Sequence, residues 1–174
     1  MSGPVQPEPR AFCPDCGTRL GHGTRWPTCP ACGHVAYRNP LVGVAMVVRD
    51  DRGHVLMGQR ARGDYAHLWC IPCGYVEWGE DVRAAAEREL LEETGLQARA
   101  TYVIAVHSNF HNEKQYTVGV WFAAEDVAGA CEPVDGEFRQ VAYFDPAAPP
   151  PVAFPTDALV LAQLAAAVGD TEAH

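Results

Sequence analysis

The alternation of apolar and polar positions predicts helices and strands over most of the chain. Residues 81–93 form the clearest helical pattern, with Asp81 placed to cap its start and Gly95 to end it. An apolar stripe at helical spacing predicts a second helix over residues 156–168. Runs rich in β-branched and aromatic residues predict five strands, at 41–48, 54–60, 98–107, 115–123 and 138–144.

The order of these elements divides the chain. Strands interleaved with helices from residue 39 to residue 170 predict an α/β domain. Residues 11–38 are rich in Cys, Gly and Pro with little apolar periodicity, so they predict a separate small unit that meets the α/β domain at Asn39-Pro40. Residues 1–10 predict a disordered tail.

The overall charge limits the classes of partner. The 174 residues include 13 basic and 22 acidic side chains, a net charge of −9. A general nucleic-acid binder normally shows a basic patch, and an acidic membrane surface repels an acidic protein. The charge therefore argues against nucleic acid and against a membrane surface as partners.

The cysteine count bears on the cellular compartment. Seven cysteines are an odd number, and the first residues show no apolar leader segment. Metal binding is then favoured over a disulfide framework, and we expect a cytoplasmic protein.

Three glutamates of the predicted helix carry the strongest chemical signal. Glu89, Glu92 and Glu93 are spaced i, i+3 and i+4, which places them on one helical face. Three carboxylates this close repel one another unless a cation lies among them. Hard divalent ions such as Mg²⁺ or Mn²⁺ take oxygen ligands of this kind and commonly bridge phosphates. A solvated charged face is the alternative interpretation.

The surrounding spacing excludes that alternative. Residues 74–96 match Gly-x5-Glu-x7-Arg-Glu-U-x-Glu-Glu-x-Gly-U at every fixed position, where U is aliphatic. By average residue usage, a chance match is on the order of one in ten million. The pattern is the Nudix box, and residues 41–168 resemble a Nudix hydrolase.

The resemblance implies a fold, an activity and residue roles. It implies a mixed sheet between helices, an α/β/α sandwich, and Mg²⁺-dependent hydrolysis of a nucleoside diphosphate linked to another group. Glu89, Glu92 and Glu93 would be metal ligands or catalytic, with the backbone carbonyl of Gly74 as a further ligand. Arg88 would orient Glu89, with Glu80 as a supporting carboxylate. A homodimer is the default that the family implies.

The general base stays open at this point. In this family the base lies in the box or on a later loop. The candidates are Glu89, Glu113, Glu132, Asp135 and Glu137.

The cysteine-rich segment predicts a second metal site. Two Cys-x-x-Cys pairs lie twelve residues apart, and four thiolates at this spacing suit tetrahedral Zn²⁺. The segment is too short and polar to fold on a core of its own, so structural zinc would supply much of its folding free energy. The expected ligands of this zinc ribbon are Cys13, Cys16, Cys29 and Cys32.

A zinc ribbon before a Nudix domain resembles two groups of enzymes, NADH pyrophosphatases and pyrophosphatases of FAD or ADP-ribose. NADH pyrophosphatases carry a Ser-Gln-Pro-Trp motif after the box, and residues 97–125 contain nothing like it. The segment 153–156 resembles the FAD and ADP-ribose group. We therefore expect a dinucleotide or nucleotide-sugar substrate, with FAD or ADP-ribose ahead of NADH. The alternatives are an enzyme for NADH or NAD-capped RNA, and a non-catalytic nucleotide-sensing module.

Overall fold

The computed structural model describes residues 11–21, 26–37, 39–112 and 115–171. The tail predicted at residues 1–10 and the candidate base Glu113 lie outside the described residues. Across the described part of the chain, no helix is long and apolar enough to cross a membrane.

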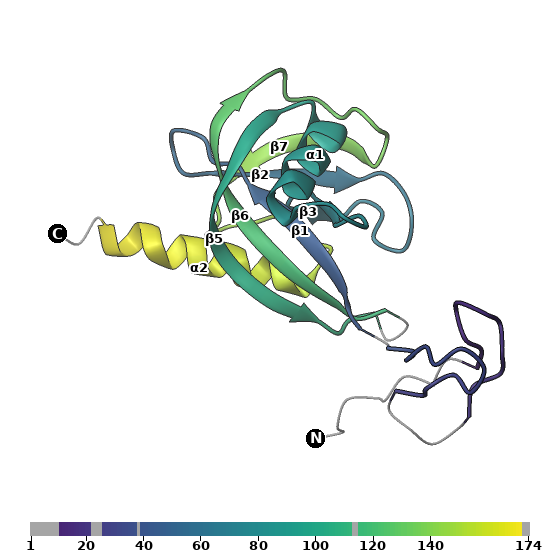
Figure 1. The fold of residues 1–174 in the computed structure, drawn as a ribbon. Coiled ribbons are helices and arrows are strands. Elements are labelled where there is room, and N and C mark those ends of the chain that lie inside the picture. The colour runs from purple at the N-terminus through teal and green to yellow at the C-terminus, as the bar shows by residue number, and fades with distance from the viewer. Residues whose placement is uncertain (1–10, 22–25, 38, 113–114, 172–174) are drawn as a thin grey trace.

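Two β-sheets form the body of the protein (Figure 1). The four-stranded sheet has the order β4-β1-β6-β5, with β1 parallel to β6 and the other neighbours antiparallel. The three-stranded sheet has the order β3-β2-β7 and is antiparallel throughout. The strands are β1 (Leu41–Val47), β2 (Val55–Arg60), β3 (Trp69–Cys70), β4 (Cys73–Tyr75), β5 (Gln97–Asn109), β6 (Thr117–Ala128) and β7 (Phe138–Phe144).

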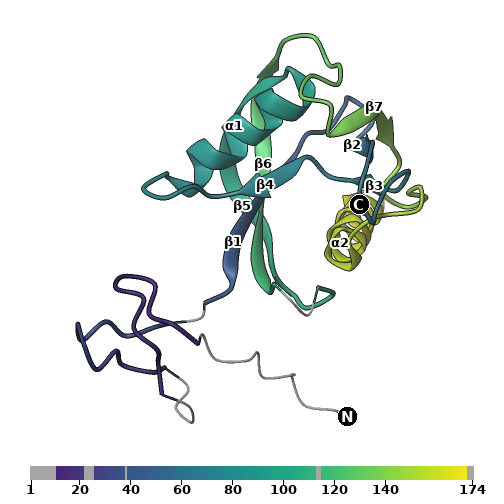
Figure 2. The ribbon, with the colours of Figure 1, turned by 90° about the vertical axis from the view of Figure 1, so that its right-hand side faces the viewer.

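Two helices of the described residues, α1 (Val82–Thr94) and α2 (Pro155–Thr171), lie on opposite sides of the strands (Figure 2). Successive residues of β1 face opposite sides because a strand alternates its side chains. Ala45 and Val47 therefore pack in the core beside α2, whereas Val44 and Met46 pack in the core beneath α1. The expected mixed sheet between helices is confirmed.

The helix that carries the acidic motif begins and ends as its sequence predicts. The Asp81 side chain accepts hydrogen bonds from the backbone N–H groups of Arg83 and Ala84. Gly95 ends α1 in the left-handed conformation, with φ of 71°, and its N–H donates to the carbonyl of Leu91. The helix is thus capped at both ends, and its buried residues Ala85, Ala86 and Leu90 pack on the β1 side of the core, which fixes its acidic face relative to the sheet.

The strands differ from the sequence prediction mainly at their ends. Residues 69–79, where no strand was predicted, contain the two short strands β3 and β4. β6 continues five residues beyond the predicted end because its last part pairs with the start of β5, where Gln97 faces Ala128. The local pattern did not predict a strand over residues 125–128, because these residues include two acids.

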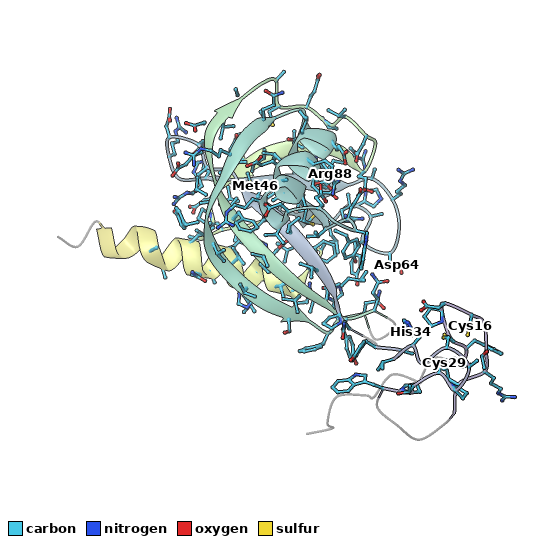
Figure 3. All side chains as sticks on the ribbon, in the orientation of Figure 1. Cys16, Cys29, His34, Met46, Asp64 and Arg88 are labelled. Atoms are coloured by element: carbon cyan, nitrogen blue, oxygen red, sulfur yellow. The ribbon has the colours of Figure 1, made fainter. Side chains whose placement is uncertain are left out.

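The cysteine-rich segment consists of two small matching loops. In each, the glycine after the second cysteine donates its N–H to the carbonyl of the first, from Gly17 to Cys13 and from Gly33 to Cys29, both at 3.0 Å. Both glycines have positive φ, a conformation that glycine adopts without strain. Figure 3 shows this segment, with Cys16, Cys29 and His34 labelled, at one end of the molecule.

Candidate active site and metal centre

Arg88 lies at the centre of the acidic cluster. Its guanidinium donates to both oxygens of Glu80, at 2.8 and 3.0 Å, and to the Oε1 atom of Glu89 at 2.9 Å. It also donates to Glu92 at 3.0 Å and to the backbone carbonyl of Tyr75 at 3.1 Å. One side chain thus joins three carboxylates to the loop that precedes the helix.

These contacts act on the charges of the carboxylates in different ways. Hydrogen bonds from Arg88 lower the pKa of Glu80 to about 2, so this carboxylate is ionised at neutral pH. Burial raises the pKa of Glu89, although Arg88 opposes that effect. Glu80 is therefore a fixed negative partner of Arg88, whereas Glu89 is the more readily neutralised acid.

Glu93 is the most buried acid of the helix, with 1% of its surface exposed. Its Oε2 atom accepts a hydrogen bond of 2.8 Å from the backbone N–H of Cys73. Its Oε1 atom is buried and has no partner among the described residues. Burial raises the pKa of Glu93 well above its ordinary value. A buried carboxylate oxygen without a donor is costly unless a ligand binds it, and a cation is such a ligand.

Gly74 allows the loop to approach this cluster closely. A methyl group on its α-carbon would overlap the carboxylate of Glu89. The absence of a side chain is therefore required by contact between the loop and the helix, which fits the position of glycine in the motif.

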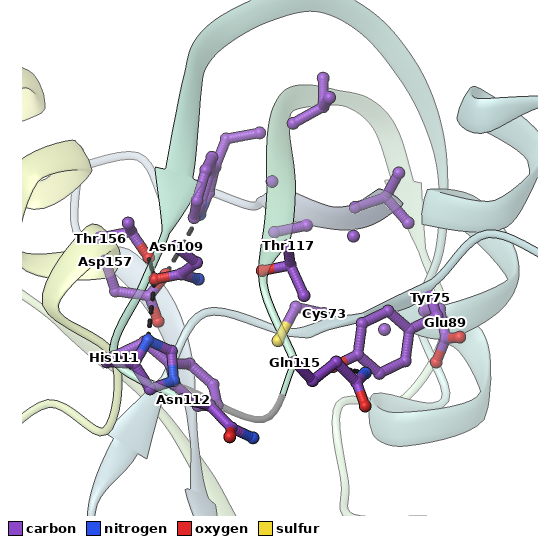
Figure 4. Close-up of a pocket in the computed structure, with 18 of the residues that line it drawn as sticks. Cys73, Tyr75, Glu89, Asn109, His111, Asn112, Gln115, Thr117, Thr156 and Asp157 are labelled. Carbon is purple, nitrogen blue, oxygen red and sulfur yellow. Dashed lines mark hydrogen bonds between the residues drawn. The ribbon is translucent and has the colours of Figure 1, made fainter. Parts of the chain in front are cut away.

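A cavity of about 510 Å³ opens beside the acids (Figure 4). It lies within the size range of small-molecule sites. Residues Gly74, Glu77 and Glu89 line one part of it, and residues from β5, β6 and the start of α2 line another. Among the base candidates that the structure describes, Glu89 and Glu137 line the cavity, whereas Glu132 and Asp135 do not.

Asp157 is a buried acid of this cavity that the sequence did not single out. Its Oδ2 atom accepts from the backbone N–H of Ile71 at 3.1 Å, and its Oδ1 atom accepts from the indole of Trp121 at 3.1 Å. Burial raises its pKa to about 7, opposed by these two donors. Asp157 joins α2 to β6 and to the segment between β3 and β4. A single acid at the start of a helix gave no signal of this role.

The four cysteines of the N-terminal segment come together as the spacing predicts. Their sulfur atoms all lie within 4.8 Å of one another, close enough to share one tetrahedral ion. In the part of the chain that the structure describes, no other set of three or more His, Cys, Asp or Glu side chains converges in this way. The three helical glutamates share a face without meeting at one point. His34, beside the cluster, pairs with Asp15 at 2.7 Å.

The comparisons with known proteins agree with this geometry. A sequence model of the NUDIX domain matches residues 39–164, so the chain belongs to the Nudix family. A NUDIX hydrolase structure from Nitrosomonas europaea superimposes with a TM-score of 0.67 and 26% identity, over 90% of this chain and 89% of that one.

Two curated relatives differ in their named substrates. The chain is 30% identical over 144 residues to an NAD-capped RNA hydrolase, NudC, of Pseudomonas aeruginosa, covering 81% of this chain and 50% of the relative. It is 26% identical over 125 residues to an ADP-ribose pyrophosphatase of Methanocaldococcus jannaschii, covering 71% of this chain and 73% of the relative. The chain spans about half the length of the NudC relatives that it matches.

Proposed function

We propose that the protein is a divalent-metal-dependent pyrophosphohydrolase that cleaves the P–O–P bridge of a nucleoside diphosphate derivative. The observation that carries this proposal is the Oε1 atom of Glu93, which is buried without a partner among the described residues. The other carboxylate oxygen of Glu93 accepts from the N–H of Cys73, which lines the same cavity as Glu89. Membership of the Nudix family supports the same reaction class.

We assign Mg²⁺, or Mn²⁺, to Glu89, Glu92, Glu93 and the backbone carbonyl of Gly74. The donor set is made of hard oxygen atoms, and the unpartnered oxygen of Glu93 fits such a ligand. When bound, the ion supplies charge neutralisation on the phosphates and lowers the pKa of a water molecule. Arg88 holds Glu89 and Glu92 in position and keeps their carboxylates from moving apart.

The general base is proposed to be Glu89 or Glu137. Both line the cavity, so both can reach a water molecule that attacks phosphorus there. The exposed residues Glu132 and Asp135 lie outside the cavity lining, which argues against a direct role for either.

The substrate that we propose is ADP-ribose or FAD. The ADP-ribose pyrophosphatase of Methanocaldococcus jannaschii supports this choice over most of its own length. The lack of a Ser-Gln-Pro-Trp motif after the box argues against NADH. Hydrolysis of NADH or of an NAD cap on RNA is the second candidate, favoured by the higher identity to NudC.

We further propose that Cys13, Cys16, Cys29 and Cys32 hold one structural Zn²⁺. Four thiols offer a closed tetrahedral set with no open position for a substrate. We assign the zinc ribbon to residues 11–38 and the hydrolase domain to residues 39–170. The homodimer stays a prediction.

The test is a substrate panel with products identified by mass. FAD, ADP-ribose, NADH, an NAD-capped RNA and a nucleoside triphosphate are each incubated with the protein and Mg²⁺, and again with EDTA. Metal-dependent release of AMP from ADP-ribose or FAD is the expected result. Preference for NADH or capped RNA would select the second candidate. Nucleotide binding without turnover of any substrate would instead identify a sensor.

A further inference from the structure

The wall of the cavity away from Glu89 is lined by a different set of side chains. Figure 4 shows Asn109, His111, Thr156 and Asp157 grouped on one side and Glu89 on the other. The first group comes from the end of β5, the loop that follows it and the start of α2, outside residues 74–96. Whatever this group recognises is therefore separate from the cation site.

Three aromatic rings form a corner in this wall. The ring of Tyr65 meets the edge of Phe154 at 5.3 Å and 64°, and that of His111 at 5.8 Å and 81°. His111 and Phe154 lie 5.6 Å apart and only 35° from parallel. All three line the cavity, and edge-to-face contacts fix their orientation. A planar heteroaromatic ring is the ligand that such a corner suits.

The aromatic corner is also held by hydrogen bonds. The hydroxyl of Thr156 donates to the Oδ1 atom of Asn109 at 3.3 Å, and the Nδ1 atom of His111 lies 2.9 Å from the same oxygen. Asn109 thus connects the loop that carries His111 to the start of α2. A subsite fixed in this way loses little conformational entropy when it binds a ring.

Arg60 provides a positive charge beside the aromatic corner. Its guanidinium lies over the Phe154 ring, 5.6 Å from the centroid. Its closest ion-pair contact is long, 3.9 Å to Glu137, and its Nε atom is buried without a hydrogen-bond partner among the described residues. A guanidinium placed in this way can still bind an anion, and its fork matches a phosphate.

We propose that Tyr65, His111 and Phe154 bind the planar heteroaromatic ring of the substrate, while Arg60 binds the phosphate of the same nucleotide. This inference rests on the proposed function and adds the direction in which the substrate lies. The diphosphate lies between Arg60 and the acids of α1, and the ring points away from them. Phe154 selects for a ring, and Arg60 selects for a phosphate.

Equilibrium binding tests the proposal without turnover. The probes are AMP, FMN and ribose 5-phosphate, which share a phosphate but differ in the ring, titrated calorimetrically in Mg²⁺. We expect AMP or FMN to bind at least about tenfold more tightly than ribose 5-phosphate, as stacking on an aromatic ring implies. The tighter of the two identifies the ring. Equal binding of all three probes would overturn the proposal.

Variants separate the two roles. Phe154→Leu should reduce the preference for the ring about tenfold, whereas Arg60→Gln should weaken all three probes about tenfold. Arg62→Gln is the matched control, because Arg62 is exposed and does not line the cavity. An unchanged preference in Phe154→Leu, or unchanged affinities in Arg60→Gln, would contradict the proposal.

Phe154→Tyr and Arg60→Lys are the conservative variants at the same two positions. Circular dichroism measures whether each variant is folded. The first keeps the ring and should bind within about twofold of the wild type, and the second keeps the charge but loses the fork. If the protein prefers AMP or FMN over ribose 5-phosphate but turns over no substrate, the proposed function is refuted and the subsite is not. If the protein turns over a substrate but shows no such binding preference, the subsite is refuted and the proposed function is not.

Discussion

The cysteine-rich segment and the sheet domain of this protein each have a candidate metal site, and we expect the two regions to depend on metal in opposite ways. Among its described residues, 11–21 and 26–37, the segment buries a cluster of four, and two of them are cysteines. The sheet domain has two apolar cores that pack on both sides of β1. A segment without an apolar core needs its ion in order to fold, whereas a domain with a core can reserve its ion for chemistry.

The sharpest test of this contrast is Glu93→Gln. We expect turnover to fall by about a thousandfold or more, because the substitution removes a charged ligand from the proposed cation site. The thermal midpoint should change little, since glutamine can still accept the hydrogen bond from Cys73. Glu125→Gln, at an exposed position of β6, serves as the control for rate. Near-normal turnover would refute the assignment.

In the cysteine-rich segment we expect the opposite result, in which loss of a proposed metal ligand affects folding. Cys29→Ser should abolish binding of one equivalent of zinc, measured by mass spectrometry of the metal, and make residues 11–37 sensitive to protease. The sheet domain should keep its thermal midpoint because its cores do not include this segment. Cys131→Ser removes an exposed thiol outside the cluster and should change neither quantity. Full zinc content in Cys29→Ser would exclude the four-cysteine site.

Gly74→Ala probes the boundary between structure and chemistry in the sheet domain. The added methyl overlaps the carboxylate of Glu89, which must move away from its present position. We expect turnover to fall about 10- to 100-fold with a small change in stability, as for other residues that position a metal ligand. Gly21→Ala, where nothing lies within 4 Å of the added carbon, is the control. Wild-type turnover would show that Glu89 does not need this position.

The smallest expected effect is the pH dependence of stability that Asp157 contributes. Burial raises its pKa from 3.8 to about 7. Between these values the folded protein holds a proton that the unfolded chain has released, so the free energy of unfolding falls as pH rises. Asp157→Asn cannot titrate and should remove about 1 kcal/mol per pH unit of that decline between pH 5 and 7. Denaturant unfolding of both proteins measures it, and parallel pH profiles would contradict the prediction.

The sequence predicted what depends on local spacing. The caps of α1, the shared face of its glutamates and the convergence of four cysteines all follow from residues close together in the chain. The contacts of Asp157 and the corner formed by Tyr65, His111 and Phe154 join segments far apart in the chain. Such contacts are set by the packing of two sheets and leave no local pattern.

The cavity is assembled from two kinds of parts, and this has a consequence for how its specificity can change. The proposed metal ligands come from one continuous stretch, residues 74–93, which a single exchange would transfer intact, whereas Glu137 and Asp157 reach the cavity from elsewhere in the chain. The facing wall is assembled from separate places along the chain, with Arg60, His111 and Phe154 each in a different element or loop. The proposed metal ligands can thus be exchanged as a block, while the residues of the proposed ring and phosphate subsite can change one at a time. Related enzymes can then diverge in what they cleave while the reaction itself stays the same.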